Sequence, residues 1–278
     1  MKMLATIAWR NVWRSRGRSL VVIGSIVVGI WALIFMLGFM NGFMISYING
    51  AIRHEISHIQ IHEANFKKDP NIGFVIPGGM DLAESLASDS RILAVSARSV
   101  TSGMISSPRK SSGGKIYGII PERERLVTHH DSLITEGSYF KSNLKNPVII
   151  GKELANSLKV KLNSKVVLTF QDRENNLVAG AFRVAGLLET TSPQINKASA
   201  YIRMEDLTRI AGLKEGVHEI ALLLENPESE INLLPDLRAT HPDLLIESWR
   251  EIAPELELFL SMTDSFLWVL IGIIMIAL

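Results

Sequence analysis

An uninterrupted apolar stretch near the N-terminus constrains this chain more than any other feature. No Asp, Glu, Lys or Arg occurs between Arg18 and Arg53, and residues 20–45 are almost entirely apolar or glycine. A helix needs roughly 20 such residues to cross about 30 Å of hydrocarbon. We therefore predict a transmembrane helix over residues 19–48. A cleaved signal peptide is the alternative, but its apolar region runs to only about 7–15 residues and ends at a small-residue cleavage site.

The charges before this helix predict its orientation. Five basic residues lie within residues 1–18, whereas the first acid of the chain is Glu55. This asymmetry predicts a cytoplasmic N-terminus. Residues 1–18 also fit a short amphipathic helix on the inner membrane surface, with indoles at the interface and guanidinium groups near lipid phosphates. An irregular positive flank that only sets orientation is the alternative. The predicted membrane-surface residues are Trp9, Arg10, Trp13, Arg14, Arg16 and Arg18.

A second apolar stretch lies at the other end of the sequence, where no charge follows Asp264. Residues 265–278 would span only about 21 Å as a helix. A helix that stopped inside hydrocarbon would leave carbonyl groups without partners. We therefore expect residues 259–278 to be the start of a second transmembrane helix, truncated here, and the natural chain to continue beyond it.

Small residues recur at helical spacing in the first apolar stretch. Gly38, Gly42 and Ser46 are four residues apart, as are Ser25 and Gly29. Small side chains at this spacing let a second helix approach closely, which predicts packing within a larger helical bundle. The alternative is that glycine is simply common in membrane helices.

Between the membrane segments, residues 49–258 form one predicted extracytoplasmic domain of the α+β class. Alternating apolar positions predict strands at 58–62, 92–107, 115–120, 165–170, 179–189, 198–202, 218–224 and 244–248. Helical patterns occupy 80–88, 204–211 and 228–239, and residues 148–158 fit a strand, a glycine turn and a helix. The SSGGK run from Ser111 is typical of a turn. Residues 134–213 are a candidate inserted subdomain, and we expect the flanking pieces to pair with each other.

Composition and motifs argue against catalysis by this chain. It has no cysteine, which excludes disulfides and thiolate chemistry, and its net charge of +1 gives no case for nucleic-acid binding. Neither a phosphate-binding G-x-x-x-x-G-K-[ST] loop nor a G-x-S-x-G elbow occurs. We therefore expect a non-enzymatic chain that carries no cofactor of its own.

One motif offers a catalytic alternative. Residues 54–58 match H-E-x-x-H, in which His54 and His58 on a helix could bind zinc while Glu55 polarises water. Glu84 or Glu122 would have to supply a third ligand. However, the alternating residues 58–62 predict a strand directly after the motif, and a helix-to-strand junction cannot present both histidines from one helix. A membrane-anchored zinc protease is therefore retained only as an alternative.

Several segments together resemble a known family. They are AWRNVWRSRGRS from Ala8, Met40-Asn41-Gly42-Phe43, VIIGKELANSLKV from Val148, and FRVAGLLE followed by AYIRMEDLTRIAGL. In order and spacing they resemble the FtsX/MacB-like permeases of ABC transporters, specifically the lipoprotein-releasing (LolC/LolE-like) type. The usual Gly-Asp turn of that family is replaced by Asn163-Ser164.

The resemblance implies a multi-pass permease of the bacterial inner membrane with a MacB-like periplasmic core domain between its first two helices. It implies a separate cytoplasmic ATPase that holds ATP and magnesium, and a second permease subunit, identical or different. It also implies release of lipoproteins or another hydrophobic substrate from membrane lipid, with a periplasmic lipoprotein carrier as a further partner. The implied substrate-cavity residues are Met40, Phe43, Met44, Phe266 and Leu270. A membrane sensor with a periplasmic ligand-binding domain is the principal alternative.

Overall fold

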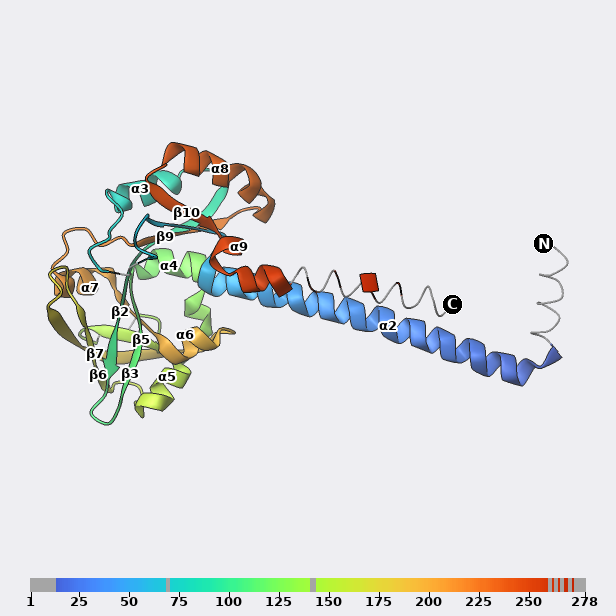
Figure 1. Cartoon of the computed structure of the whole chain (residues 1–278). Helices are drawn as coiled ribbons and strands as arrows, with labels where there is room; N and C mark the ends of the chain where they lie inside the picture. The colour runs from blue at the N-terminus through green and yellow to red at the C-terminus, as the bar shows by residue number, and fades with distance from the viewer. Residues whose placement is uncertain are drawn as a thin grey trace. The chain divides into compact units, whose positions relative to one another are not determined.

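The computed structural model describes residues 14–68, 71–140, 144–259, 262, 265, 268, 269 and 272. The chain divides into two units, one formed by Met1–Tyr47 with Leu258–Leu278 and the other by Ile48–Glu257. The first unit contains most of helix α2 (Arg16–Ala51), which continues into the π-helical turn η1 (Ile52–Ile56) of the second. Figure 1 shows the elements of both units.

Helix α2 covers the apolar stretch that predicts a transmembrane helix. Its 36 residues would extend about 54 Å at 1.5 Å per residue. Within the described ranges, one helix, Arg16–Ile56, is long and apolar enough to cross a membrane. Its large apolar side chains are exposed along most of its length, Trp31 and Phe35 for example by 66% and 62%. Such a surface is stable only against lipid or other apolar partners.

The second unit alternates strands with short helices, as the sequence pattern predicts. Its strands are β1 (Ile59–Glu63), β2 (Ile92–Ser106), β3 (Ser111–Ile119), β4 (Ile134–Gly137), β5 (Pro147–Gly151), β6 (Lys165–Gln171), β7 (Leu177–Leu188), β8 (Ser199–Arg203), β9 (Glu219–Leu224) and β10 (Leu244–Ser248). Its α-helices are α3 (Gly79–Leu86), α4 (Pro121–Thr128), α5 (Lys152–Leu158), α6 (Pro193–Ala198), α7 (Met204–Ala211), α8 (Glu230–Thr240) and α9 (Trp249–Ile252). Short 3₁₀ turns are η2 (His130–Leu133) and η3 (Pro227–Ser229).

All ten strands belong to one mixed sheet with the order β10-β1-β9-β2-β3-β8-β5-β7-β4. The β3–β8 and β5–β7 pairs are parallel and the remaining pairs are antiparallel. Strand β6 pairs with both β2 and β7, which closes a ring of hydrogen-bonded strands, β2-β3-β8-β5-β7-β6. The predicted α+β class is confirmed.

The long strand β2 belongs to both halves of the sheet. Its first part, up to Arg98, pairs with β9, and its second part, from Arg98 onward, pairs with β3. Arg98 lies opposite Glu219 on one side and Ile119 on the other. The backbone of β2 therefore passes from one half of the domain to the other at Arg98.

Each half has its own apolar core. Side chains of β1, β2 and β9 pack with Ala83 and Leu86 of α3 and with Leu233 and Leu237 of α8. The strands of the ring enclose a second core that is completed by α5 and α7. In Figure 1, α3 and α8 lie beside β9 and β10, whereas α5 and α6 lie at the other end of the sheet. Because apolar side chains fill both cores, burial stabilises each half separately.

The two ends of the domain lie side by side. Strand β1, which follows η1, pairs antiparallel with β10, so that Ile59 lies opposite Ser248. The amide of Trp249 donates to the carbonyl oxygen of His58 at 2.9 Å, and α9 contacts η1. The predicted pairing of the flanking pieces is thus confirmed.

The SSGGK run is not the turn that the sequence predicts. The turn lies earlier, at residues 107–110, where the Ser107 hydroxyl accepts from the amides of Arg109 and Lys110. Gly113 and Gly114 are within β3 instead. A Cβ at Gly114 would lie 2.4 Å from the carbonyl oxygen of Ala198, so glycine is required there by the close approach of α6 and not by a turn.

This close approach leads to a stability prediction. Gly114→Ala should destabilise the domain by about 1–3 kcal/mol, because backbone must move to admit the methyl group. Gly113→Ala is the matched control, since a Cβ at that position meets nothing within 4 Å, and its effect should stay within about 0.5 kcal/mol. Urea unfolding of the fragment Ile48–Glu257 measures the free energy of unfolding of both variants. Equal losses would show that the close approach of α6 does not require Gly114.

Candidate functional site

Helix α4 lies over the middle of the sheet and adjoins η1. Pro121 occupies its first turn together with Glu122 and Glu124, which suits a helix start because proline needs no amide partner there and acids favour the positive end of the helix dipole. Val127 packs on Ala221 and Leu223 of β9. α4 therefore covers the face of β9 opposite to the one covered by α3 and α8.

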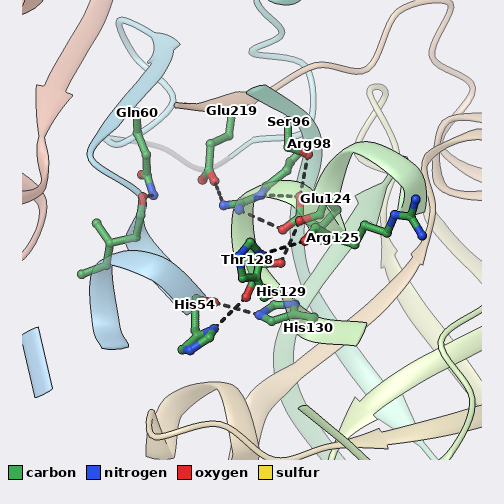
Figure 2. A network of polar contacts seen from close by, with 11 residues as sticks. His54, Gln60, Ser96, Arg98, Glu124, Arg125, Thr128, His129, His130 and Glu219 are labelled. Carbon is green, nitrogen blue, oxygen red and sulfur yellow. Dashed lines mark hydrogen bonds and ion pairs between the residues drawn. The ribbon is translucent and has the colours of Figure 1, made fainter. Parts of the chain in front are cut away.

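A buried ionic network fastens α4 to the sheet (Figure 2). Glu124 is fully buried, and Arg98 contacts its two oxygens at 2.8 and 2.9 Å. The other end of the guanidinium lies 2.5 Å from Glu219 on β9. The hydroxyl of Ser96 also donates to Glu124 at 2.6 Å. One arginine thus joins α4, β2 and β9 at the point where the two halves of the sheet meet.

Electrostatics keep this network charged. Burial by itself raises the pKa of the Glu124 carboxyl, but the Arg98 charge and the hydrogen bonds from Arg98 and Ser96 outweigh it, so this pKa lies below its usual value. Burial by itself lowers the pKa of Arg98, and the two facing carboxylates outweigh that effect and raise it. Both partners therefore remain ionised although both are removed from water.

Two histidines join η1 to the end of α4 reciprocally. The ring Nδ1 of His54 donates to the carbonyl oxygen of Thr128 at 2.7 Å, and the ring Nε2 of His130 donates to the carbonyl oxygen of His54 at 2.8 Å. A carbonyl oxygen can only accept, which assigns the proton to those two nitrogens. Burial lowers the pKa of His130 to about 4, so its ring is neutral at neutral pH. We call this pair of bonds the histidine clamp.

The backbone after η1 is strained. The amide of Ser57 closes the π-turn on the carbonyl oxygen of Ile52 at 2.7 Å, and Ser57 has φ 67° and ψ 177°. Glycine alone occupies this region without cost, and π-turns themselves are concentrated at functional positions. Gln60 of β1 adds a further tie, because its amide donates to the carbonyl oxygen of Ile56 at 2.7 Å.

Of the H-E-x-x-H residues, His54 belongs to this network, and the structure places His54 and His58 on different elements. His54 belongs to η1, whereas His58 lies beyond Ser57, where its Nδ1 accepts from the amide of Leu224 at 3.1 Å. Glu84 pairs with Arg123 at 3.1 Å. In the part of the chain that the structure describes, no group of three metal-binding side chains occurs.

The predicted residues of the apolar helix are all on α2. Met40 and Phe43 are exposed, by 41% and 63%, and Met44 is half-buried. The small residues Ser25, Gly29, Gly38, Gly42 and Ser46 are exposed, as are Arg14, Arg16 and Arg18. A Cβ added at Gly29, Gly38 or Gly42 would meet nothing within 4 Å. The predicted residues Trp9, Arg10, Trp13, Phe266 and Leu270 lie outside the described residues.

A small pocket lies at the start of α4. Its volume is about 320 Å³, near the lower limit for small-molecule sites. Arg203, Glu122 and Glu205 are among its lining residues, so the lining has mixed charge. The other lining residues are Ile119, Ile120, Pro121, Phe140 and Met204.

Most residues of this network cannot be recognised from the sequence. The signal for α4 was present, because Pro121 is followed by Glu122 and Glu124, but the segment reads equally as a loop after a strand. Glu124, Thr128, His130 and Glu219 have no local pattern that marks them. Their partners are between 26 and 121 residues away in sequence, so only the folded sheet brings them together.

Comparison with known proteins identifies the family. The model of the MacB-like periplasmic core domain matches residues 19–239. The chain belongs to this family. It is therefore one of the MacB/FtsX-like ABC transporter permeases, which confirms the resemblance at the level of this broader family and the general transporter role. Membership of this family implies an ATPase partner and paired permeases. No curated protein matched the chain.

One of the matched solved structures shows the same fold. The chain is similar to the periplasmic region of MacB from Actinobacillus actinomycetemcomitans, with 14% identity and a TM-score of 0.51, over 76% of this chain and 98% of that one. It also matches the extracellular domain of the noncanonic ABC-type transporter YknZ from Gram-positive bacteria (16% identity, TM-score 0.47, 69% and 100% covered). A domain of a putative permease protein from Porphyromonas gingivalis matches with 14% identity and a TM-score of 0.40, over 68% and 87%.

The ionic network predicts a large loss of stability when its cation is removed. Arg98→Met should lower the free energy of unfolding of this MacB-like domain by about 3–5 kcal/mol, because two buried carboxylates lose their partner. Arg91→Met removes an arginine from the half-exposed pairs with Asp89 and Asp236 and should cost less than about 1 kcal/mol. Urea unfolding measures both. If Arg98→Met lowered the free energy of unfolding only slightly, Arg98 would not be pairing with the two buried carboxylates as described.

Acid should destabilise the domain through its buried histidines. Burial lowers the pKa of His58 and His130 to about 4, from 6.5 in the unfolded chain. The unfolded chain then binds protons that the folded one does not, so the free energy of unfolding falls as the pH drops from about 6.5 to about 4.

His130→Gln should make this dependence shallower while keeping a donor to His54. The raised pKa of Glu55, caused by burial, acts in the opposite direction, but it is common to both proteins. Urea unfolding at several pH values between neutral and acid compares the slopes. Identical slopes would show that His130 does not titrate as described.

Proposed function

We propose that this chain is a permease subunit that couples ATP hydrolysis by a separate cytoplasmic subunit to movement of the domain Ile48–Glu257 outside the inner membrane. The observation that carries the proposal is the pairing of β1 with β10. β1 follows the apolar helix, and β10 leads through α9 toward the second apolar segment. Movements of both membrane segments therefore reach the domain at one place.

The substrate that we propose is a lipoprotein or another hydrophobic molecule released from the membrane. Met40, Phe43 and Met44 supply flexible thioethers and a ring on α2, which suit acyl chains of varied shape. Removing acyl chains from a bilayer costs about 0.8 kcal/mol per CH₂, which calls for an energy source such as ATP. A soluble carrier outside the membrane would then accept the released molecule.

The same proposal gives roles to the basic residues at the beginning of α2 and to the small residues along it. Arg14, Arg16 and Arg18 are exposed at its beginning, where they would face the anionic cytoplasmic leaflet and keep the N-terminus inside. The small residues from Ser25 to Ser46 would admit a neighbouring helix, either of this multi-pass chain or of a second permease subunit. ATP and magnesium belong to the partner ATPase, and the chain itself performs no catalysis.

Site-specific photocrosslinking tests the proposed substrate. The full-length permease, purified with its ATPase in proteoliposomes, receives a photoreactive phenylalanine at Met40, Phe43 or Met44. A fluorescent triacylated lipopeptide should crosslink at these positions and should be released when ATP is added. Ile26, an exposed residue of the same helix, is the matched control and should crosslink far less.

The same peptide without acyl chains should not crosslink at any position. Equal crosslinking at Ile26 and Phe43, or crosslinking that ATP does not change, would exclude the proposed path along α2. Failure of any ATPase to co-purify with the permease would count against the coupling itself.

A further inference from the structure

The turn η1 is connected covalently to the sheet only through the short backbone segment that leads to β1. After η1 only Ser57 and His58 precede β1. A chain held by two residues alone could rotate about their backbone bonds, so a displacement of α2 would turn η1 without moving the sheet. Something else must hold η1 if movement is to reach the domain.

Gln60 of β1 and α9, which follows β10, contact η1, and the histidine clamp is what ties η1 to α4. His54 donates to Thr128 and His130 donates to His54, so each of the two segments provides both a ring donor and a backbone acceptor. The bonds of 2.7 and 2.8 Å run in opposite directions between η1 and the end of α4, as Figure 2 shows. Two bonds crossed in this way resist rotation better than one.

From the clamp, contacts lead to both halves of the sheet. The hydroxyl of Thr128 donates to the carbonyl oxygen of Glu124 at 3.0 Å, and the carboxylate of Glu124 is held by Arg98. Arg98 stands where β2 passes between the halves and also contacts Glu219 of β9. A displacement at η1 therefore has a continuous path of short polar contacts into the centre of the domain.

The backbone at Ser57 is also strained, which a turn with only a structural role would not require. Ser57 is 1% exposed, its hydroxyl has no hydrogen-bond partner, and its backbone occupies a region suited to glycine. The surrounding contacts must hold it there. Releasing the clamp would let this residue relax.

We propose that residues 52–57 form a strained joint through which α2 drives the domain, with His54 and His130 as the positioning residues that lock the joint to α4. This inference rests on the proposed coupling function and specifies its mechanical element. Without the clamp, ATP hydrolysis continues but less of it becomes domain movement. A clamp that only stabilised the folded domain would not change how much domain movement each ATP produces.

The test compares variants in the full-length permease with its ATPase. His54→Ala and His130→Leu each remove one clamp bond. His54→Asn and His130→Gln each keep an amide donor near the position of the lost ring nitrogen. His129→Asn is the matched control, because His129 is the neighbouring histidine, its ring bonds to the carbonyl oxygen of Arg125 within α4, and its positive φ is one that asparagine tolerates.

Two readouts are measured in proteoliposomes. One is the amount of triacylated lipopeptide released per ATP hydrolysed. The other is maleimide labelling of Ser57→Cys, read on the peptide that contains residue 57, with the permease that keeps Ser57 as the background. Residues 1–278 contain no cysteine of their own, and this readout needs no transport substrate. During ATP turnover, labelling should be slow in the otherwise unmodified protein and about tenfold faster with His54→Ala or His130→Leu, as loss of one hydrogen bond allows.

The expected pattern is loss of release per ATP with His54→Ala and His130→Leu, recovery with His54→Asn and His130→Gln, and no change with His129→Asn. Unchanged release and unchanged Ser57→Cys labelling in the clamp variants would overturn the joint. If the unmodified permease hydrolyses ATP but releases no lipopeptide, the proposed substrate is wrong, and the labelling arm still decides on the joint.

Discussion

The buried contact of Arg98 with Glu124 and Glu219 is the constraint on which the rest of this domain depends. A charge removed from water is costly unless it is paired, and here one guanidinium serves two carboxylates from different elements. Because Arg98 lies where β2 leaves one half of the sheet and joins the other, its pairing fixes both halves and α4 together. The apolar cores stabilise each half separately, and the ionic network sets how the two are joined to the helix above them.

The position of α4 in turn determines how the chain enters the domain. The end of α4 supplies the backbone acceptor at Thr128, and His130 follows two residues later, so η1 is held next to the buried ionic network. The last strand returns to the same place, since β10 pairs with β1. Under the proposed coupling function, a domain whose two ends meet beside this network would receive movement of both membrane segments at one place. This arrangement gives the MacB-like family fold a physical basis for its role in a transporter.

The apolar helix differs from the domain in what stabilises its surface. Its large apolar side chains are exposed, and such a surface is stable only against lipid or other apolar partners. A Cβ at Gly29, Gly38 or Gly42 of this helix would meet open space, whereas Gly103 and Gly114 of the sheet are pressed against backbone atoms. Glycine thus leaves open space on the helix, whereas in the sheet it permits close approach of backbone segments.

The sequence by itself determined the apolar helix, the α+β class and most strands, because charge-free length and alternating polarity are local properties that report directly on the surroundings of each segment. The family could also be inferred from it, since the motifs keep their order. Local patterns misled where glycine had a non-local reason: SSGGK reads as a turn, yet Gly114 faces Ala198. H-E-x-x-H likewise reads as a metal motif, although His54 bonds Thr128, 74 residues away. Only the tertiary structure decided the site, because Arg98, Glu124, Glu219 and His130 acquire their partners from strand order and helix placement, which no spacing in the sequence encodes.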